Sequence, residues 1–143
     1  MTDSSKIPGT ADDAEARFYD AIARADIDAL MAIWSDEEDI VCIHPGAARL
    51  TGVASVRASW EAIFERGGVH IRPLQLHVSH NLMTAVHSIV EAIHRADNQP
   101  QEVHVLATNV YIKTALGWRI VMHHASVAPG RAPAASPPAT LLH

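Results

Sequence analysis

Residues 103–112, which read VHVLATNVYI, decide the fold class of this chain. The segment is rich in Val, Thr, Tyr and Ile, the residue types that favour β-strands. Successive side chains of a strand point to opposite faces, so both faces of this strand carry apolar residues: Val103, Val105 and Ala107 on one, Leu106, Val110 and Ile112 on the other. One face can pack on helices. The other needs a cover, which a second subunit or the C-terminal tail could supply.

Further strands are predicted on both sides of this segment. A turn leads to a last strand over 118–125, and residues 74–79 alternate apolar and polar side chains with the period of a strand. The Ala and Glu content of 84–94 would permit a helix, but both neighbours are strands, so we predict a strand there as well. The short β-branched run 40–44 is too brief for a helix and predicts one more strand.

Three helices are predicted before the main part of the sheet. Asp12 has the features of an N-cap, with Glu15 three residues later, and Asp26 and Asp28 can cap a second short helix. The apolar stripes are Phe18, Ala21, Ile22 and Ala25, then Ile27, Leu30, Met31 and Trp34, then Val56, Trp60, Ile63 and Phe64. This order of elements predicts an α+β domain with helices on one face of an antiparallel sheet.

Length and composition limit the possible classes of protein. The 143 residues fit one domain, and we expect an N-terminal arm over 1–10, a domain over 11–128 and a Pro/Ala-rich tail over 129–143. A net charge of −5 argues against nucleic acid and anionic membranes as partners. No apolar run approaches the ~20 residues of a membrane span, and the first residues do not read as a secretory signal. We therefore expect a cytoplasmic protein.

Several motifs occur along the chain in a characteristic order: FYDAI at 18–22, DIDAL at 26–30, IHP at 43–45, GVASVR at 52–57, ATNVY at 107–111, and GWRIV at 117–121 followed by HHAS at 123–126. Across residues 11–128 this order resembles the nuclear-transport-factor-2-like (NTF2-like) superfamily, in its SnoaL-like and ketosteroid-isomerase-like branch. The resemblance implies a cone-shaped α+β barrel, in which a curved antiparallel sheet wraps around three N-terminal helices. It also implies an apolar pocket at the open end and a homodimer through the outer sheet face.

The resemblance allows a comparison with ketosteroid isomerase, which uses a carboxylate base together with a tyrosine and a protonated aspartic acid. The tyrosine of that enzyme falls on Phe18, its base on His44, and its aspartic acid on or near Thr108. None of these three groups is kept. We therefore do not expect a steroid isomerase of that mechanism.

His44 is the candidate catalytic residue, because an imidazole at the family's base position can act as a general base. It could instead be a hydrogen-bonded residue at the end of a strand. The candidate ligand-binding residues are Phe18, Trp34, Trp60, Thr108, Asn109 and His124. The aromatic residues could instead be core, and Thr108 and Asn109 could make cross-strand hydrogen bonds. His123 and His124 face opposite sides of a strand, so one is interior and the other lies outside.

Two functions stay open at this point. The first is a pocket that binds a small, largely apolar molecule, with or without acid–base catalysis of the isomerase, cyclase or dehydratase kind. The second is a non-catalytic ligand-binding or homo-association domain. No His-x-His pair, phosphate-binding loop or dinucleotide fingerprint occurs. We therefore expect neither a metal nor a cofactor.

Overall fold

The computed structural model describes residues 9–94 and 102–128, so most of the predicted arm and all of the predicted tail lie outside it. In this part of the chain the helices are α1 (Ala11–Ala23), α2 (Ile27–Ile33) and α3 (Val53–Phe64). The strands are β1 (Val41–Ile43), β2 (Leu50–Thr51), β3 (His70–His80), β4 (Thr84–His94), β5 (Val103–Thr114) and β6 (Gly117–Val127). The α+β class and the strand at 84–94 are confirmed.

The first two helices begin at side chains that accept hydrogen bonds from free backbone N–H groups. The predicted cap at Asp12 is wrong: Thr10 caps α1, and its hydroxyl accepts from the N–H of Asp13. Asp26 caps α2 as expected, accepting from the N–H of Ala29. Only three residues join α1 and α2, and the two helices pack against each other.

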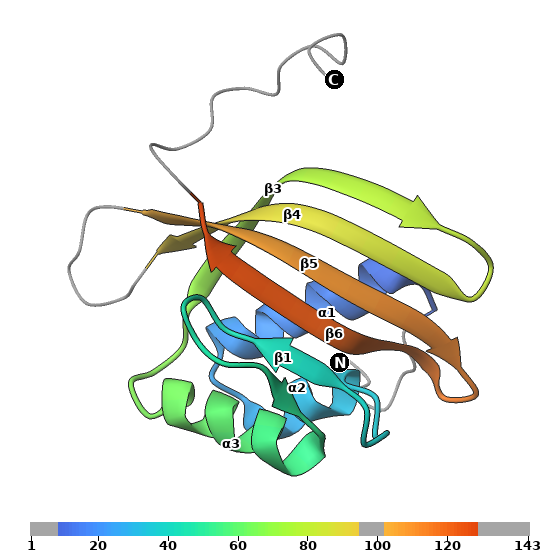
Figure 1. The fold of residues 1–143 in the computed structure, drawn as a ribbon, viewed down its shortest axis with the longest axis horizontal. Coiled ribbons are helices and arrows are strands. Elements are labelled where there is room, and N and C mark those ends of the chain that lie inside the picture. Colours follow the sequence, from blue (N-terminus) through green and yellow to red (C-terminus); the bar gives the residue numbers. More distant parts are fainter. Residues whose placement is uncertain (1–8, 95–101, 129–143) are drawn as a thin grey trace, which may run out of the picture.

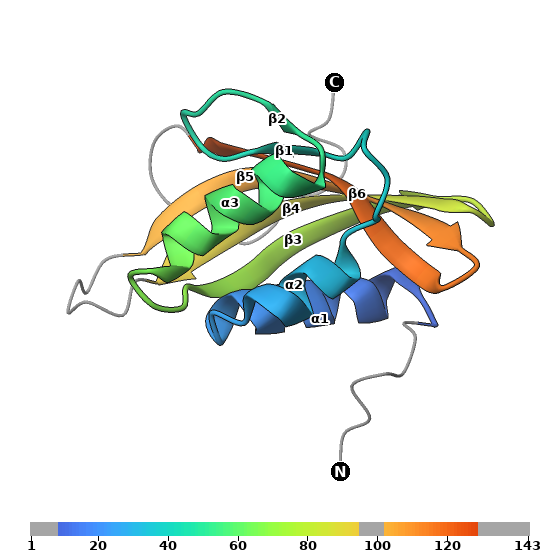
Figure 2. The ribbon, with the colours of Figure 1, turned by 90° about the horizontal axis from the view of Figure 1, so that it is seen from below.

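The strands form one sheet in the order β2-β1-β6-β5-β4-β3 (Figure 1). Neighbouring strands are antiparallel except β1 and β6, which run parallel. The sheet curves over α1 and α2, while α3 lies beside β1 and β2 (Figure 2). The short strand β2 was not predicted, because two residues carry no periodicity. No helix in the described residues is long and apolar enough to span a membrane.

Two irregularities change which side chains face inwards. In β3 the register shifts between Leu74 and His77, where Gln75 has a φ of 50°, so the alternation predicted for 74–79 does not continue through the strand. In β6, Met122 pairs with Val110 and Ile120 pairs with Tyr111, which leaves Val121 as an extra residue. Ile120 and the residues from His123 onwards therefore no longer follow one alternating pattern.

The register across the four central strands sorts side chains into rows. On the inner face, His87, Asn109, His123 and Cys42 lie in one row across β4, β5, β6 and β1. On the outer face, Val86, Val110 and Met122 form one row, and Ser88, Thr108 and His124 form the next. The inner row is buried, whereas Val86 and His124 in the outer rows are exposed. The prediction that both faces of β5 carry apolar residues is confirmed.

Candidate functional site

A buried carboxyl group on α1 lies at the centre of a polar network inside the cone. Glu15 is only 7% exposed, and its Oε2 accepts hydrogen bonds from the hydroxyl of Tyr111 at 2.7 Å and the amide of Asn109 at 3.4 Å. Nδ1 of His87 lies 2.8 Å from the same oxygen. One face of α1 therefore places an acceptor opposite polar side chains of β4 and β5.

A second buried carboxyl group belongs to Glu91 on β4. The hydroxyl of Tyr19 donates to its Oε2 at 2.7 Å and accepts from Nδ2 of Asn109 at 3.0 Å. Burial raises the pKa of Glu91 to about 7, against an ordinary value of 4.5, and raises the pKa of Tyr19 far above its usual range. Tyr19 therefore remains a hydrogen-bond donor, while Glu91 gains or loses its proton close to neutral pH.

These contacts determine which nitrogen of His123 carries a proton. The amide nitrogen of Asn109 donates to Glu15 and Tyr19, so its carbonyl oxygen faces His123 Nδ1, 2.6 Å away. Because a carbonyl oxygen can only accept a hydrogen bond, Nδ1 of His123 must carry a proton and donate it to Asn109. Burial lowers the pKa of His123 to about 3, so the ring is neutral at physiological pH and its other nitrogen, Nε2, is left as an acceptor.

His123 connects the polar network to a cluster of aromatic side chains. Its ring centroid lies 5.3 Å from that of Phe18 and 6.0 Å from that of Trp60. Phe18 packs edge-to-face on Trp34 at 6.3 Å and on Trp60 at 6.0 Å. We call Phe18, Trp34 and Trp60 the aromatic cluster; each is at most 4% exposed.

His44 lies at the border of this cluster, just after β1, and is half-buried. Its ring is 4.8 Å from that of Trp60, and its Nε2 is 3.0 Å from Ser59 Oγ. The Ser59 hydroxyl already donates to the Val56 carbonyl, so it accepts from His44 Nε2 and leaves Nδ1 as the basic nitrogen. Burial lowers the pKa of His44, which keeps the ring neutral at pH 7.

Two polar atoms of the aromatic cluster stand apart from the network. Among the described residues, the indole N–H groups of Trp34 and Trp60 are buried and have no hydrogen-bond partner. Burial raises the pKa of the Cys42 thiol to about 12, and the nearby indole of Trp60 acts in the opposite direction. A thiol sulfur is a weak acceptor, however, and no regular hydrogen bond forms.

The structure gathers five of the residues predicted for the site and separates two. Phe18, Trp34 and Trp60 are part of the hydrophobic core, which is the alternative left open for them, while Asn109 is buried in the polar network and His44 lies at the border of the cone. In contrast, Thr108 and His124 lie together in one row of the outer face. Thr108 lies on the outer face because it is next to the buried Asn109 in β5, and successive side chains of a strand point to opposite faces. His124 lies outside because the extra residue Val121 reverses the alternation, so His123 is the interior histidine.

Most of the polar network was not predicted from the sequence: Glu15, Tyr19, His87, Glu91 and Tyr111. The pattern around Asp12 predicts Glu15 as a capping partner at the start of the first helix. Two signals could have found them. Glu15 and Tyr19 are four residues apart on α1, and the others share strand alternation with buried positions on β4 and β5. Within residues 9–94 and 102–128, no three His, Cys, Asp or Glu side chains form a possible metal-binding group.

The fold and its polar interior define the class of protein: an NTF2-like α+β cone. The chain belongs to the SnoaL-like domain family, whose model matches residues 12–129. No curated protein sequence matches it significantly.

Solved structures show the same architecture. One from Thiobacillus denitrificans, named as a candidate calcium/calmodulin-dependent protein kinase type II association domain, is 33% identical with a TM-score of 0.77, covering 86% of this chain and 98% of that one. A candidate dehydratase of the NTF2-like family from Streptomyces avermitilis is 29% identical with a TM-score of 0.75, covering 82% and 92%. An NTF2-like protein of unknown function from Pseudomonas putida is 23% identical with a TM-score of 0.70, covering 79% and 80%.

Proposed function

We propose that the protein binds a small, largely apolar molecule inside the cone and carries out acid–base chemistry on it, of the isomerase, cyclase or dehydratase type. The observation that carries this proposal is the buried network around Glu15 and Glu91. Burial of two carboxyl groups and two histidines is costly, and buried groups with a shifted pKa, such as Glu91, are concentrated at functional sites. The Streptomyces avermitilis relative, named as a candidate dehydratase, agrees with such chemistry.

His44 is the proposed base. It is the titratable group of the site that is only half-buried, so a ligand can reach it from the surface. Its lowered pKa makes it neutral and able to accept a proton at pH 7. Glu91, with a pKa of about 7, is the second group able to exchange a proton. Both the amide nitrogen and the amide oxygen of Asn109 are already hydrogen-bonded within the protein. We therefore assign Asn109 a positioning role, in which it orients the ring of His123.

A thermal-shift screen tests this proposal with steroids, polyketides, aromatic acids and fatty acids as probes. A ligand present at about one hundred times its Kd adds about 2.7 kcal/mol of stability. We expect at least one class to stabilise the wild type and His44→Ala to weaken that effect. His80→Ala, at an exposed position on β3, is the matched control. If a ligand raises the melting temperature of all three proteins equally, His44 does not take part in binding.

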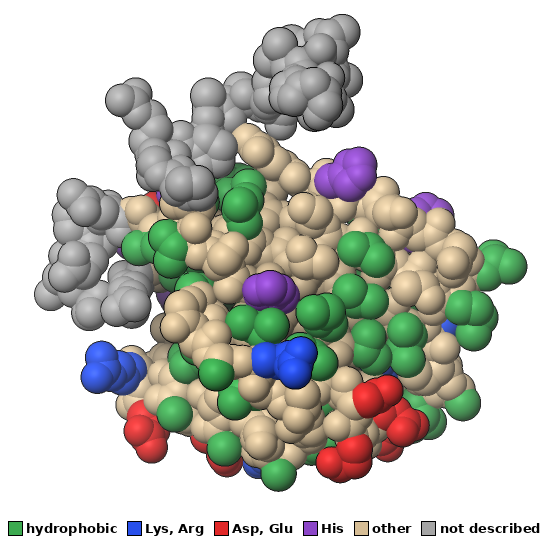
Figure 3. All heavy atoms as spheres, in the orientation of Figure 1, with side chains coloured by type: hydrophobic (Ala, Val, Ile, Leu, Met, Phe, Trp, Pro, Cys, Tyr) green, Lys and Arg blue, Asp and Glu red, His purple; other side chains and the backbone are tan. Residues whose placement is uncertain are grey.

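Homo-association through the outer sheet face is the second candidate function, and we propose that a second copy of this chain covers that face. Hydrophobic side chains are spread over this face (Figure 3). Leu106 is 46% and Val86 is 36% exposed there. The Thiobacillus denitrificans relative is named as an association domain, which favours the same use of the fold.

Sedimentation analysis tests the association. The wild type is expected to sediment as a dimer and Leu106→Glu as a monomer, because a buried unpaired charge opposes the interface. Leu116→Glu, in the exposed turn between β5 and β6, is the control and should leave the dimer intact. A monomeric wild type would reject this second candidate without affecting the first.

A further inference from the structure

We propose that the indole N–H groups of Trp34 and Trp60 together bind one neutral carbonyl oxygen of the ligand. This inference rests on the proposed binding function and specifies the ligand class. Both donors are buried, with Trp34 at 2% and Trp60 at 4% exposure, and neither has an acceptor among the described residues. A buried N–H without an acceptor is costly, so an oxygen placed between them gains two hydrogen bonds.

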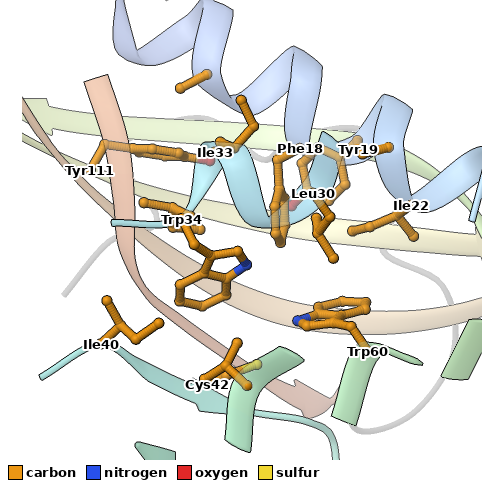
Figure 4. Close-up of a cluster of buried hydrophobic side chains, with 14 of the residues drawn as sticks. Phe18, Tyr19, Ile22, Leu30, Ile33, Trp34, Ile40, Cys42, Trp60 and Tyr111 are labelled. Atoms are coloured by element: carbon orange, nitrogen blue, oxygen red, sulfur yellow. The ribbon is translucent and has the colours of Figure 1, made fainter. Parts of the chain in front are cut away.

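The positions of the two indoles make a shared acceptor feasible. Both pack edge-to-face on the ring of Phe18, with centroids 6.3 Å and 6.0 Å away. They come from different elements: Trp34 follows α2 and Trp60 lies in α3. Figure 4 shows their nitrogen edges turned towards each other rather than outwards. A carbonyl oxygen has two lone pairs and can accept from both donors at once.

The charges of the interior favour a neutral carbonyl over a carboxylate. The buried polar and charged side chains of the described residues are Glu15, Ser35, His87, Glu91, Asn109 and His123, with no Lys or Arg among them. His44 and His123 have lowered pKa values and supply no positive charge at pH 7. An anionic group would therefore lose its hydration without gaining a cation.

The surroundings also favour a ligand that is apolar apart from this oxygen. Phe18, Leu30 and Cys42 are fully buried next to the two indoles (Figure 4). Since Trp60 also contacts the ring of His44, an oxygen held by the indoles lies close to the proposed base. A carbonyl held in this way becomes more polarised, which would make a C–H bond beside it easier for a base to deprotonate. The ligand class is thus an apolar ketone, aldehyde, ester or amide.

The test uses three probes with similar ring systems: 1-tetralone (a neutral ketone), tetralin (the same skeleton without oxygen) and 1-naphthoate (a carboxylate). Indole N–H resonances of ¹⁵N-labelled wild-type protein are recorded during titration. We expect 1-tetralone to move the signals of Trp34 and Trp60 downfield and to leave Trp118, which is only partly buried, in place. Tetralin should bind more weakly without a downfield shift, and naphthoate should bind least.

Variants give a second measurement. Trp34→Phe and Trp60→Phe keep an aromatic ring but remove the donor, and each should weaken 1-tetralone binding about three- to tenfold while changing tetralin binding little. Trp118→Phe is the matched control. If 1-tetralone and tetralin bind equally well and the two indole signals do not move downfield, the carbonyl site is wrong but the apolar pocket stands. Preferential binding of naphthoate overturns the neutral-ligand assignment. If none of the probes binds the wild type, the result counts against both the pocket and the carbonyl site.

Discussion

The polar network and the aromatic cluster lie side by side in the same interior, but they differ in whether their polar atoms have hydrogen-bond partners. In the network, Tyr19 and Asn109 both donate and accept, and Glu15 accepts hydrogen bonds from Asn109 and Tyr111 of β5. In the aromatic cluster, the two indole N–H groups remain without an acceptor among the described residues. A network in which every hydrogen bond is made stabilises the fold by itself, whereas donors without acceptors form hydrogen bonds only when a ligand binds. The difference separates the part of the interior whose hydrogen bonds are complete in the free protein from the part that gains hydrogen bonds when a ligand binds.

The largest effect is expected from removing the centre of the network. Glu15→Ala leaves the Tyr111 hydroxyl, the Asn109 amide and Nδ1 of His87 without their shared acceptor, and should lower the free energy of unfolding by about 4 kcal/mol. Urea denaturation measures it. Glu15→Gln, which keeps an acceptor oxygen, should cost clearly less. A loss below about 1 kcal/mol for Glu15→Ala would show that the network does not stabilise the fold.

The next effect is a pH dependence that comes from Glu91. Its pKa is about 7 in the folded protein and near 4.5 when unfolded, so the folded state binds the proton more tightly. Stability from this group is fully present below pH 4.5 and is lost as the pH rises through 7, by about 3 kcal/mol. The lowered pKa of His123 acts in the opposite direction: its contribution grows as the pH rises from about 3 to 6.5.

Comparing the wild type with Glu91→Gln isolates the carboxyl group, because His123 is present in both proteins. The amide of the variant still offers an oxygen to the Tyr19 hydroxyl. The difference in unfolding free energy between the two proteins should therefore change steadily between pH 4.5 and 7. A difference that does not vary with pH would mean that Glu91 titrates at its ordinary pKa.

A smaller effect is expected for Tyr111→Phe. This variant deletes one hydroxyl that donates to Glu15 at 2.7 Å and leaves the remaining donors in place. Loss of a hydrogen bond to a carboxylate should reduce the free energy of unfolding by about 2 kcal/mol. Urea denaturation at pH 7 provides the value. A neutral effect would indicate that Glu15 is held by His87 and Asn109 alone.

The smallest effect is expected in the aromatic cluster. Trp60→Phe in the ligand-free protein removes an N–H that has no partner among the described residues, which offsets part of the lost packing. We expect a cost below about 1 kcal/mol, less than for Tyr111→Phe although more atoms are removed. The same denaturation series compares the two. A clearly larger cost for Trp60→Phe would mean that the packing lost with the indole outweighs the gain from removing its unpartnered N–H.

The sequence predicted the architecture well because its signals are local and repeated. The apolar stripe around Phe18 and the β-branched run of β5 each recur over many residues, and both elements form as expected. The site was predicted only in part. His44 and the aromatic residues have conspicuous types, whereas Glu15 and Glu91 look like ordinary acidic residues of a helix and a strand. Helical spacing groups Glu15 with Tyr19 and strand alternation groups Glu91 with buried positions of β4, but that these side chains meet inside the cone depends on how α1 crosses the sheet, which no local pattern records.

The extra residue at Val121 in β6 affects how this chain should be compared with its relatives. It makes His123 the buried histidine and His124 the exposed one. Losing one residue at this point would exchange the two without altering the HH pair itself. An alignment that matches such pairs by position can therefore equate an interior residue with a surface residue. Inheritance of function across this family has to be traced through strand register, since identical letters at the end of this strand need not occupy the same side of the sheet.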